Sequence, residues 1–303
     1  MPTPHPGGAP GEPRVALVTC TELPELEDDD RLVFGPLAAL GIRAEAVVWD
    51  APGVDWTAYR SAVLRSPWDY ATRRDEFVAW AATVPVLANP ADIVEWNTDK
   101  RYLEALTASG VPTVPTTWVR PGEGWTAPLD GEYVIKPAVG AGSVDTGRYD
   151  CADEEHRRLA AAHVARLSTA GRVTMVQPYL ADVDTAGETA LMFFATPDGL
   201  GFSHAIRKGP MLTGPDYGVE GLYRTEKITA RIPSDVERTV AERVLAAVPG
   251  GPERLLYARV DLIPGPDGSP VLVELELTEP SLFLGYADGA AERLAQAIAL
   301  RLG

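Results

Sequence analysis

Cysteine and histidine are scarce in this chain of 303 residues, and their scarcity excludes several kinds of site. With only Cys20 and Cys151, neither a disulfide framework nor a cysteine-based zinc site is available, as expected in a reducing cytosol. The four histidines have no metal-ligand spacing such as H-E-x-x-H, and the G-x-S-x-G elbow is absent. A hydrolase of the triad kind is therefore disfavoured.

Long apolar runs are absent too. None approaches the roughly 18 residues needed to cross a bilayer, and the start lacks the charged-then-apolar pattern of a signal peptide. We therefore expect a cytoplasmic protein that does not act at a membrane. A net charge of −16 and a pI of about 4.7 argue against nucleic acid as a partner.

Lysine is rare as well. Lys100, Lys136, Lys208 and Lys227 stand beside 23 arginines. Since arginine is the default cation here, a remaining lysine points to a place where a compact ammonium group is required. The alternative is four solvated surface lysines in a chain with a coding bias toward arginine. An anionic ligand of so acidic a chain would need cations, metals or backbone amides nearby.

The hydrophobic pattern predicts an α/β protein with α+β lobes. From residue 14 to 90, short apolar runs alternate with helical spacing, which indicates a small parallel sheet. A helix over 99–109, capped by Thr98, leads into a middle part, and the chain is rich in strands from Glu188 onward. We expect a disordered Pro/Gly-rich tail and three domains, at residues 1–13, 14–96, 97–183 and 184–303.

The stretch VLVELELTEP, residues 271–280, places two carboxylates side by side. Side chains alternate along a strand, so Glu274 and Glu276 share one face. A hairpin through IPGPDGSP would bring Asp261 and Arg259 of YARVDLI to that face. Carboxylates without histidine suit Mg²⁺ or Mn²⁺. The alternative is a solvated acidic face with Arg259 as a surface partner.

A second candidate is YVIKPAVGAGS. Lys136 ends an apolar strand just before a loop of small residues, whose amides could approach phosphate oxygens. This is not a Walker A motif, and an ordinary surface loop is the alternative. In HAIRKGP, Arg207 and Lys208 could neutralise a phosphoryl group or merely lie in solvent at a strand end.

The order of these motifs resembles the ATP-grasp superfamily, particularly its glutathione-synthetase-like branch. Lys100 on a helix, V-I-K-P with its loop, V-Q-P-Y-L, R-K, R-V-D-L and V-E-L-E-L-T-E-P occur in the family's order from about residue 14 onward. More narrowly, T-C-x-x-L-P-x-L-E-D-D-D, R-S-P-W-D-Y and E-P-S-L-F-L resemble the O-ureido-serine cyclo-ligases of cycloserine biosynthesis. The resemblance implies three lobes, with ATP held between a central lid domain and a C-terminal domain.

The resemblance also implies roles for individual residues. For ATP, it implies two nucleotide-binding lysines, Lys100 and Lys136, and a mobile loop over the phosphates, Ala141, Gly142 and Ser143. It further implies a hinge that binds adenine, Gln177, Tyr179 and Leu180, and contacts at the ribose end, Asp184 and Glu188. For the metal it implies Asp261, Glu274 and Glu276, and for charge stabilisation Arg259, Arg207 and Lys208. Our candidate substrate contacts are Arg65, Ser66, Trp68 and Asp69, with Cys20 and Ser281 behind them. Two positions depart from the family pattern: Glu276 replaces a common asparagine, and Gln177 a common glutamate.

The implied chemistry is transfer of the γ-phosphoryl group of ATP to a substrate carboxylate, followed by attack of an amine-type nucleophile. For a cyclo-ligase, the nucleophile is the substrate's own aminooxy nitrogen, so attack is intramolecular. An intermolecular ligase joining an amino acid to an amine is the first alternative, and a non-catalytic ATP-binding module the second. In either ligase the partner is a small, amino-acid-like molecule. The sequence is also compatible with a homo-oligomer.

Overall fold

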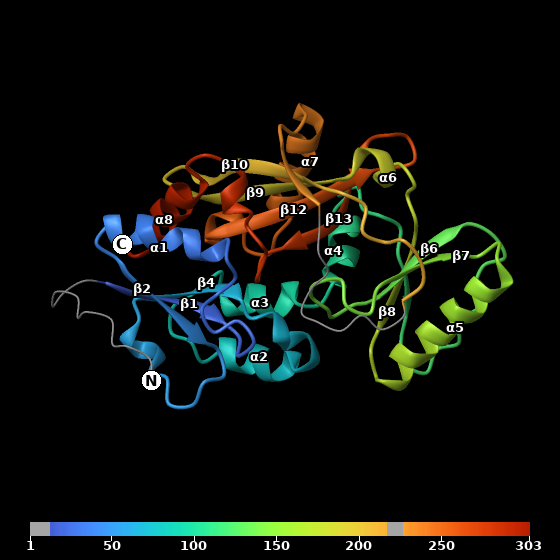
Figure 1. Cartoon of the computed structure of the whole chain (residues 1–303), viewed down its shortest axis with the longest axis horizontal. Helices are drawn as coiled ribbons and strands as arrows, with labels where there is room; N and C mark the ends of the chain where they lie inside the picture. The colour runs from blue at the N-terminus through green and yellow to red at the C-terminus, as the bar shows by residue number, and fades with distance from the viewer. Residues whose placement is uncertain (1–12, 217–226) are drawn as a thin grey trace.

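The computed structural model describes residues 13–216 and 227–303, so the predicted disordered tail lies outside the described residues except for Pro13. The described chain forms three sheets (Figure 1). The first is parallel, in the order β2-β1-β3-β4, as predicted. Its strands and flanking helices are β1 Arg14–Thr19, β2 Arg43–Val48, β3 Ser61–Ser66, β4 Leu87–Ala88, α1 Phe34–Ala39 and α2 Arg74–Ala81.

The second sheet is antiparallel, in the order β5-β8-β6-β7, and α5 packs on it (Figure 1). The α5 helix begins after Asp153, whose carboxylate accepts hydrogen bonds from the amides of Glu155 and His156. Residues 139–147, rich in glycine and small side chains, are typical of a loop, but the strand β7 already starts at Gly147. The elements are β5 Thr117–Val119, β6 Glu132–Pro137, β7 Gly147–Asp150, α5 Glu154–Thr169 and β8 Thr174–Pro178.

The third sheet, β11-β10-β9-β12-β13, is antiparallel throughout. A capping box between Ser234 and Glu237 begins α7, which packs against β12 and β13. The elements are α6 Val183–Ala186, β9 Glu188–Thr196, β10 Gly199–Lys208, β11 Ile228–Arg231, α7 Asp235–Ala246, β12 Tyr257–Pro264, β13 Pro270–Glu276 and α8 Ala290–Arg301. None of the described helices combines the length and apolar character that crossing a membrane requires.

Two short helices connect the first sheet to the second, and here one prediction was wrong. Thr98 does not cap a helix over 99–109: it ends α3, Ala91–Asn97, and its hydroxyl donates to the Val94 carbonyl. The next helix, α4, starts later, at Tyr102–Ala108. Both helices contribute to a buried cluster with β12 and β13, so this connection is packed against the third sheet.

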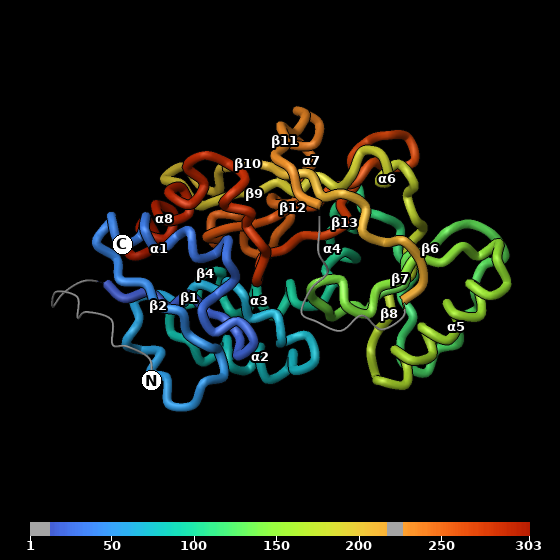
Figure 2. Tube along the Cα trace, viewed as in Figure 1, coloured from blue at the N-terminus to red at the C-terminus, as the bar shows by residue number. Residues whose placement is uncertain are grey.

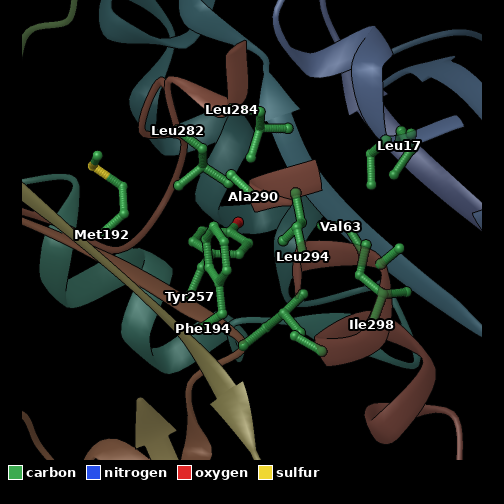
Figure 3. Packing of buried hydrophobic residues seen from close by; sticks show 14 of the residues in the cluster. Leu17, Val63, Met192, Phe194, Tyr257, Leu282, Leu284, Ala290, Leu294 and Ile298 are labelled. Atoms are coloured by element: carbon green, nitrogen blue, oxygen red, sulfur yellow. The ribbon is translucent and has the colours of Figure 1, made fainter. Parts of the chain in front are cut away.

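A core cluster joins the first and third sheets although they lie far apart in the sequence. Leu17 and Val63 of the first sheet and Phe194 and Tyr257 of the third belong to it, with Leu294 of α8 among them (Figure 3). Figure 2 shows the C-terminal α8 returning to lie beside α1. These two sheets are therefore held together by one apolar core.

Candidate active site

A cavity of about 460 Å³ lies between the second and third sheets. Its wall includes strand residues of β6, β8, β12 and β13, the loop after β6, and residues that follow β3. Polar and charged side chains from all three sheets or their connections thus converge on one space. This is the usual setting of a small-molecule site.

The β12–β13 hairpin forms as the sequence predicted. Arg259 pairs with Glu276 and Asp261 with Glu274 directly across the two strands. The Arg259 guanidinium bonds the Asp261 carboxylate through Nε and Nη2, both at 2.9 Å, and also bonds Glu276. The carboxylates are therefore half-buried or buried and ion-paired, which rules out the alternative of a solvated acidic face.

Lysines complete this charge network. Lys208 Nζ lies 2.8 Å from Asp261 and 2.7 Å from Glu188. Lys100 Nζ lies 3.1 Å from Glu274 and donates to the Gly140 carbonyl at 2.8 Å. Neither lysine is on the solvated surface, so both are retained where a compact ammonium group meets buried carboxylates.

The nearby cations affect the pKa values of the carboxylates to different extents. Burial raises the pKa of Glu276 to about 8 and that of Glu188 to about 7, although Arg259 and Lys208 respectively pull them down. For Asp261 burial also raises the pKa, but Arg259 and Lys208 outweigh it and the net pKa is lowered. For Glu276 and Glu188, the nearby cations therefore offset only part of the cost of burial, and the protonated form is favoured more than in an exposed carboxyl group.

The donor set fits a hard divalent cation that is also bound by phosphate oxygens. Oxygen ligands suit Mg²⁺, which takes one or two carboxylates and fills its remaining positions with water and phosphate. Among residues 13–216 and 227–303, no three acidic, histidine or cysteine side chains are grouped closely enough to hold a metal by themselves. Asp261, Glu274 and Glu276 thus remain proposed ligands that need phosphate oxygens beside them.

Lys136 reaches the same cavity from β6. In the described part of the chain, no hydrogen bond or ion pair holds its ammonium group, in contrast to Lys100 and Lys208. Burial lowers its pKa, while Glu274 acts in the opposite direction. A half-buried, unpaired ammonium group beside a loop of small residues is suited to receive a phosphate.

The loop after β6 borders the cavity through Ala141, Gly142 and Ser143. Ser143 and Asp145 have left-handed φ values of 58° and 55°. The Asp145 carboxylate is bound by Arg166 at 2.6 Å and by Arg172. Because these arginines belong to or follow α5, ion pairs to the second sheet hold the loop in its conformation.

The three residues predicted to form the adenine hinge, Gln177, Tyr179 and Leu180, all line the cavity. The side-chain amide nitrogen of Gln177, however, already donates a hydrogen bond to the Thr116 hydroxyl at 2.9 Å. Of the two residues expected at the ribose end, Glu188 lines the cavity. Asp184 does not: it binds the Tyr179 hydroxyl and Arg148.

Arg207 is also outside the cavity wall. It donates to the carbonyls of Ala186 and Thr185 at 2.6 and 2.8 Å, and so fixes α6 against β10. Successive strand residues point to opposite faces, so the neighbouring Lys208 faces the cavity while Arg207 faces away. The paired motif R-K could not reveal this division of roles.

The predicted substrate contacts divide likewise. Trp68 and Ser281 line the cavity. Cys20, Arg65 and Ser66 are fully buried, and Asp69 binds Trp49 and Arg73 instead. The structure thus places these four outside the cavity wall, and Arg65 among them contacts the chain that follows β13.

Arg65 connects the end of β3 to the chain that follows β13. Its Nε lies 3.0 Å from Asp30, its Nη2 donates to the Pro280 carbonyl, and its guanidinium lies 4.9 Å from the Tyr257 ring centre. Ser66 donates to the same aspartate at 2.6 Å. Arg65 therefore supports the wall rather than forming it.

Sequence reasoning missed several polar and aromatic residues of the wall. Asn97, Glu27, Asp29, Tyr70, Glu279, Phe283 and Tyr286 all line the cavity. Most of them lie within the motifs E-D-D-D, R-S-P-W-D-Y and E-P-S-L-F-L or next to them. These separated motifs come together in space, which explains their joint occurrence, and only the fold reveals which member of each faces inward.

Comparison with known proteins gives a consistent result. Residues 15–91 match the family model described as D-cycloserine synthetase DcsG, N-terminal domain. The cycloserine biosynthesis protein DcsG of Streptomyces lavendulae is 40% identical over 95% of this chain and 98% of that protein. A crystal structure of D-cycloserine synthetase DcsG matches with a TM-score of 0.83 at 38% identity, covering 96% of this chain and 100% of the other.

A more distant structure shares the fold alone. The ATP-grasp ligase PsnB, in complex with a phosphomimetic variant of its minimal precursor, Mg and ADP, matches with a TM-score of 0.61 at 17% identity. The match covers 96% of this chain and 99% of that one. The three-sheet architecture is thus the one found in ATP-dependent ligases, as the motif order predicted.

Proposed function

This chain belongs to the D-cycloserine synthetase family of ATP-grasp ligases and is an ATP-dependent ligase, and on that premise we propose that it cyclises O-ureido-serine on the way to cycloserine. The observation that carries the proposal is the cavity in which an unpaired lysine faces a partly neutralised set of carboxylates. The extent of similarity, 40% identity over 95% of the chain, supports the same substrate.

The residues of the cavity provide what ATP requires. Lys136 and Lys100 supply cations for the phosphates, and the loop of Ala141–Ser143 supplies backbone amides close to them. Asp261, Glu274 and Glu276 would hold Mg²⁺, which when bound offsets the negative charge of the triphosphate. We propose that Mn²⁺ can replace it, because the ligands are oxygens in both cases.

The first chemical step forms an acyl phosphate. A substrate carboxylate oxygen bonds to the γ-phosphorus while the bond to the bridging oxygen breaks and ADP leaves. Arg259 and Lys208, both at the metal face, are placed to offset charge on the transferring phosphoryl group. The loop after β6 would exclude water that could hydrolyse the acyl phosphate.

The second step closes the ring. The N–H nitrogen bonded to the substrate's side-chain oxygen attacks the acyl carbon, phosphate leaves with the bonding electron pair, and the N–H proton is released. The ring has five members and still carries the carbamoyl group, so cycloserine appears after water converts that group to carbon dioxide and ammonia. Because both reacting groups belong to one molecule, proximity replaces a second substrate.

The proposal is tested by measuring ADP release from ATP and Mg²⁺ with and without O-ureido-serine. We expect release that depends on this compound, and a cyclised product by mass spectrometry. Release that instead requires a second amine would identify an intermolecular ligase. ATP binding without turnover on a panel of amino acids and amines would contradict an enzymatic role.

A further inference from the structure

The 277–285 segment, which follows the metal-face strand β13, is held in place mostly by the N-terminal part of the chain. Arg65 donates to the Pro280 carbonyl, and Trp68 donates to the Glu279 carbonyl at 3.0 Å. Asp29 accepts hydrogen bonds from the amides of Leu284 and Gly285, both at 2.7 Å. The backbone that carries Glu279 is therefore fixed before any ligand enters.

Glu279 differs in its partners from the carboxylates of the metal face. Glu188, Asp261, Glu274 and Glu276 each form an ion pair with a lysine or arginine. Within the described residues Glu279 has none, and its carboxyl is hydrogen-bonded by the neutral Tyr70 hydroxyl. Glu27 and Asp29 of the wall form no ion pair with the described residues either, but their carboxylates accept hydrogen bonds from backbone amides. A cavity carboxylate held by a hydroxyl but unpaired with a cation has capacity for a ligand cation.

The position of Glu279 suits an α-amino acid. Arg259, which we place beside the phosphoryl group that is transferred to the substrate carboxylate, donates from Nη1 to the Ser281 carbonyl at 3.1 Å. The guanidinium thus lies against the same short segment that carries Glu279. In an α-amino acid the ammonium and carboxylate groups are bonded to the same carbon atom, so a molecule whose carboxylate receives the phosphoryl group beside Arg259 brings a positive charge close to this segment.

We propose that Glu279 binds the α-ammonium group of the substrate, with Tyr70 fixing the carboxylate for that contact. This rests on the proposed function and specifies a residue that selects zwitterionic amino acids over plain carboxylic acids. Burial raises the pKa of Glu279 to about 7, against the effects of Tyr70 and Lys100, in keeping with a carboxylate that lacks a cation partner. An ammonium group would favour its ionised form.

The experiment compares O-ureido-serine with its deamino analogue, 3-(ureidooxy)propanoic acid, by ATP-dependent ADP release. Wild-type protein should prefer the amino compound. Glu279→Gln should lower kcat/KM for O-ureido-serine about 100-fold, chiefly through KM, because a charge pair is lost. The same variant should leave kcat/KM for the deamino analogue within about threefold of wild type, since that analogue has no ammonium group to lose.

Glu27→Gln is the matched control, because Glu27 lines the same cavity. It should keep the preference for the amino compound. Tyr70→Phe should reduce that preference in part, since the carboxylate loses its hydroxyl partner. Thermal unfolding and nucleotide affinity show that each variant is folded.

Three results would overturn the assignment. Glu279→Gln could lower turnover of both compounds equally, it could change neither, or the preference could be lost in Glu27→Gln instead. Failure of the proposed function is distinct, because wild-type protein would then release no ADP with O-ureido-serine. In that case the same variants would be compared on the amino acid that the wild type activates and on the deamino form of that amino acid. The three results named above would again overturn the assignment of Glu279.

Discussion

Lys136 is the cavity cation that the protein itself leaves unpaired within its described residues. Lys100 and Lys208 each hold a carboxylate, so removing either disturbs the network around it. Lys136 contacts no such partner and is free to meet phosphate. A role in binding and a role in structure can therefore be separated at this residue.

Lys136→Ala should abolish turnover while the fold stays intact. The expected loss in kcat/KM is at least about 100-fold, because an ammonium–phosphate contact in a buried site is removed. Steady-state ADP release and nucleotide affinity measure the effect, and thermal unfolding serves as the control. Turnover at the wild-type rate would show that Lys136 is not a phosphate ligand.

Glu274→Gln is the corresponding test of the metal face. The amide keeps the shape of the carboxylate but not its charge, so Mg²⁺ loses a ligand and Lys100 loses its ion-pair partner. We expect turnover to be abolished, with a folded protein by circular dichroism. Wild-type turnover would remove Glu274 from the proposed ligands.

The raised pKa of Glu276 predicts how the stability of the protein changes with pH. Its pKa in the folded protein is about 8, above its ordinary 4.5, because of burial and the nearby carboxylates Glu274 and Asp261. Between these values the folded state binds more protons than the unfolded state, so the contribution of Glu276 to stability is highest at low pH and falls as pH rises. Without nucleotide or metal, the melting temperature of wild type should therefore fall from pH 5 to 8 relative to that of Glu276→Gln. A constant difference between the two would contradict the raised pKa.

At the scale of elements, the sequence predicted most strands and the β12–β13 hairpin, since alternation and the D-G turn are local signals. The short elements α3, α6, β7 and β11 were missed. Their existence depends on packing, as when Asn97 bonds the β13 backbone through both Leu275 and Leu277. Which member of a motif faces the cavity, as with Lys208 against Arg207, also depends on the assembled sheet.

The buried Arg65–Asp30 pair links β3 to the 277–285 segment, and this gives a prediction. Arg65→Met should reduce the free energy of unfolding by about 3–5 kcal/mol, because Asp30 would be left as a buried, unpaired charge. The double variant Arg65→Met, Asp30→Leu should recover much of that loss. Chemical denaturation of both variants measures this, and equal stability of the single and double variants would show that the charge of Asp30 is not the cause.

At the scale of the whole molecule, the apolar core makes the first and third sheets one unit. Leu294 of α8 is fully buried in the cluster shown in Figure 3, among residues of both sheets. The second sheet has a smaller cluster of its own, built around α5. The cavity thus lies between the third sheet, which shares a core with the first, and the second sheet, although Met175 of β8 packs in a cluster with β12 and β13.

Leu294→Ala should therefore destabilise the two joined sheets together. Truncating a fully buried leucine removes apolar contacts and leaves a cavity, which typically costs about 2–5 kcal/mol. Leu300→Ala, on the same helix but 44% exposed, is the matched control and should change stability by less than about 0.5 kcal/mol. In thermal unfolding followed by hydrogen exchange, amides of β1 and β9 should lose protection in parallel in Leu294→Ala. Loss of protection in β9 alone would show that α8 does not join the two sheets into one cooperative unit.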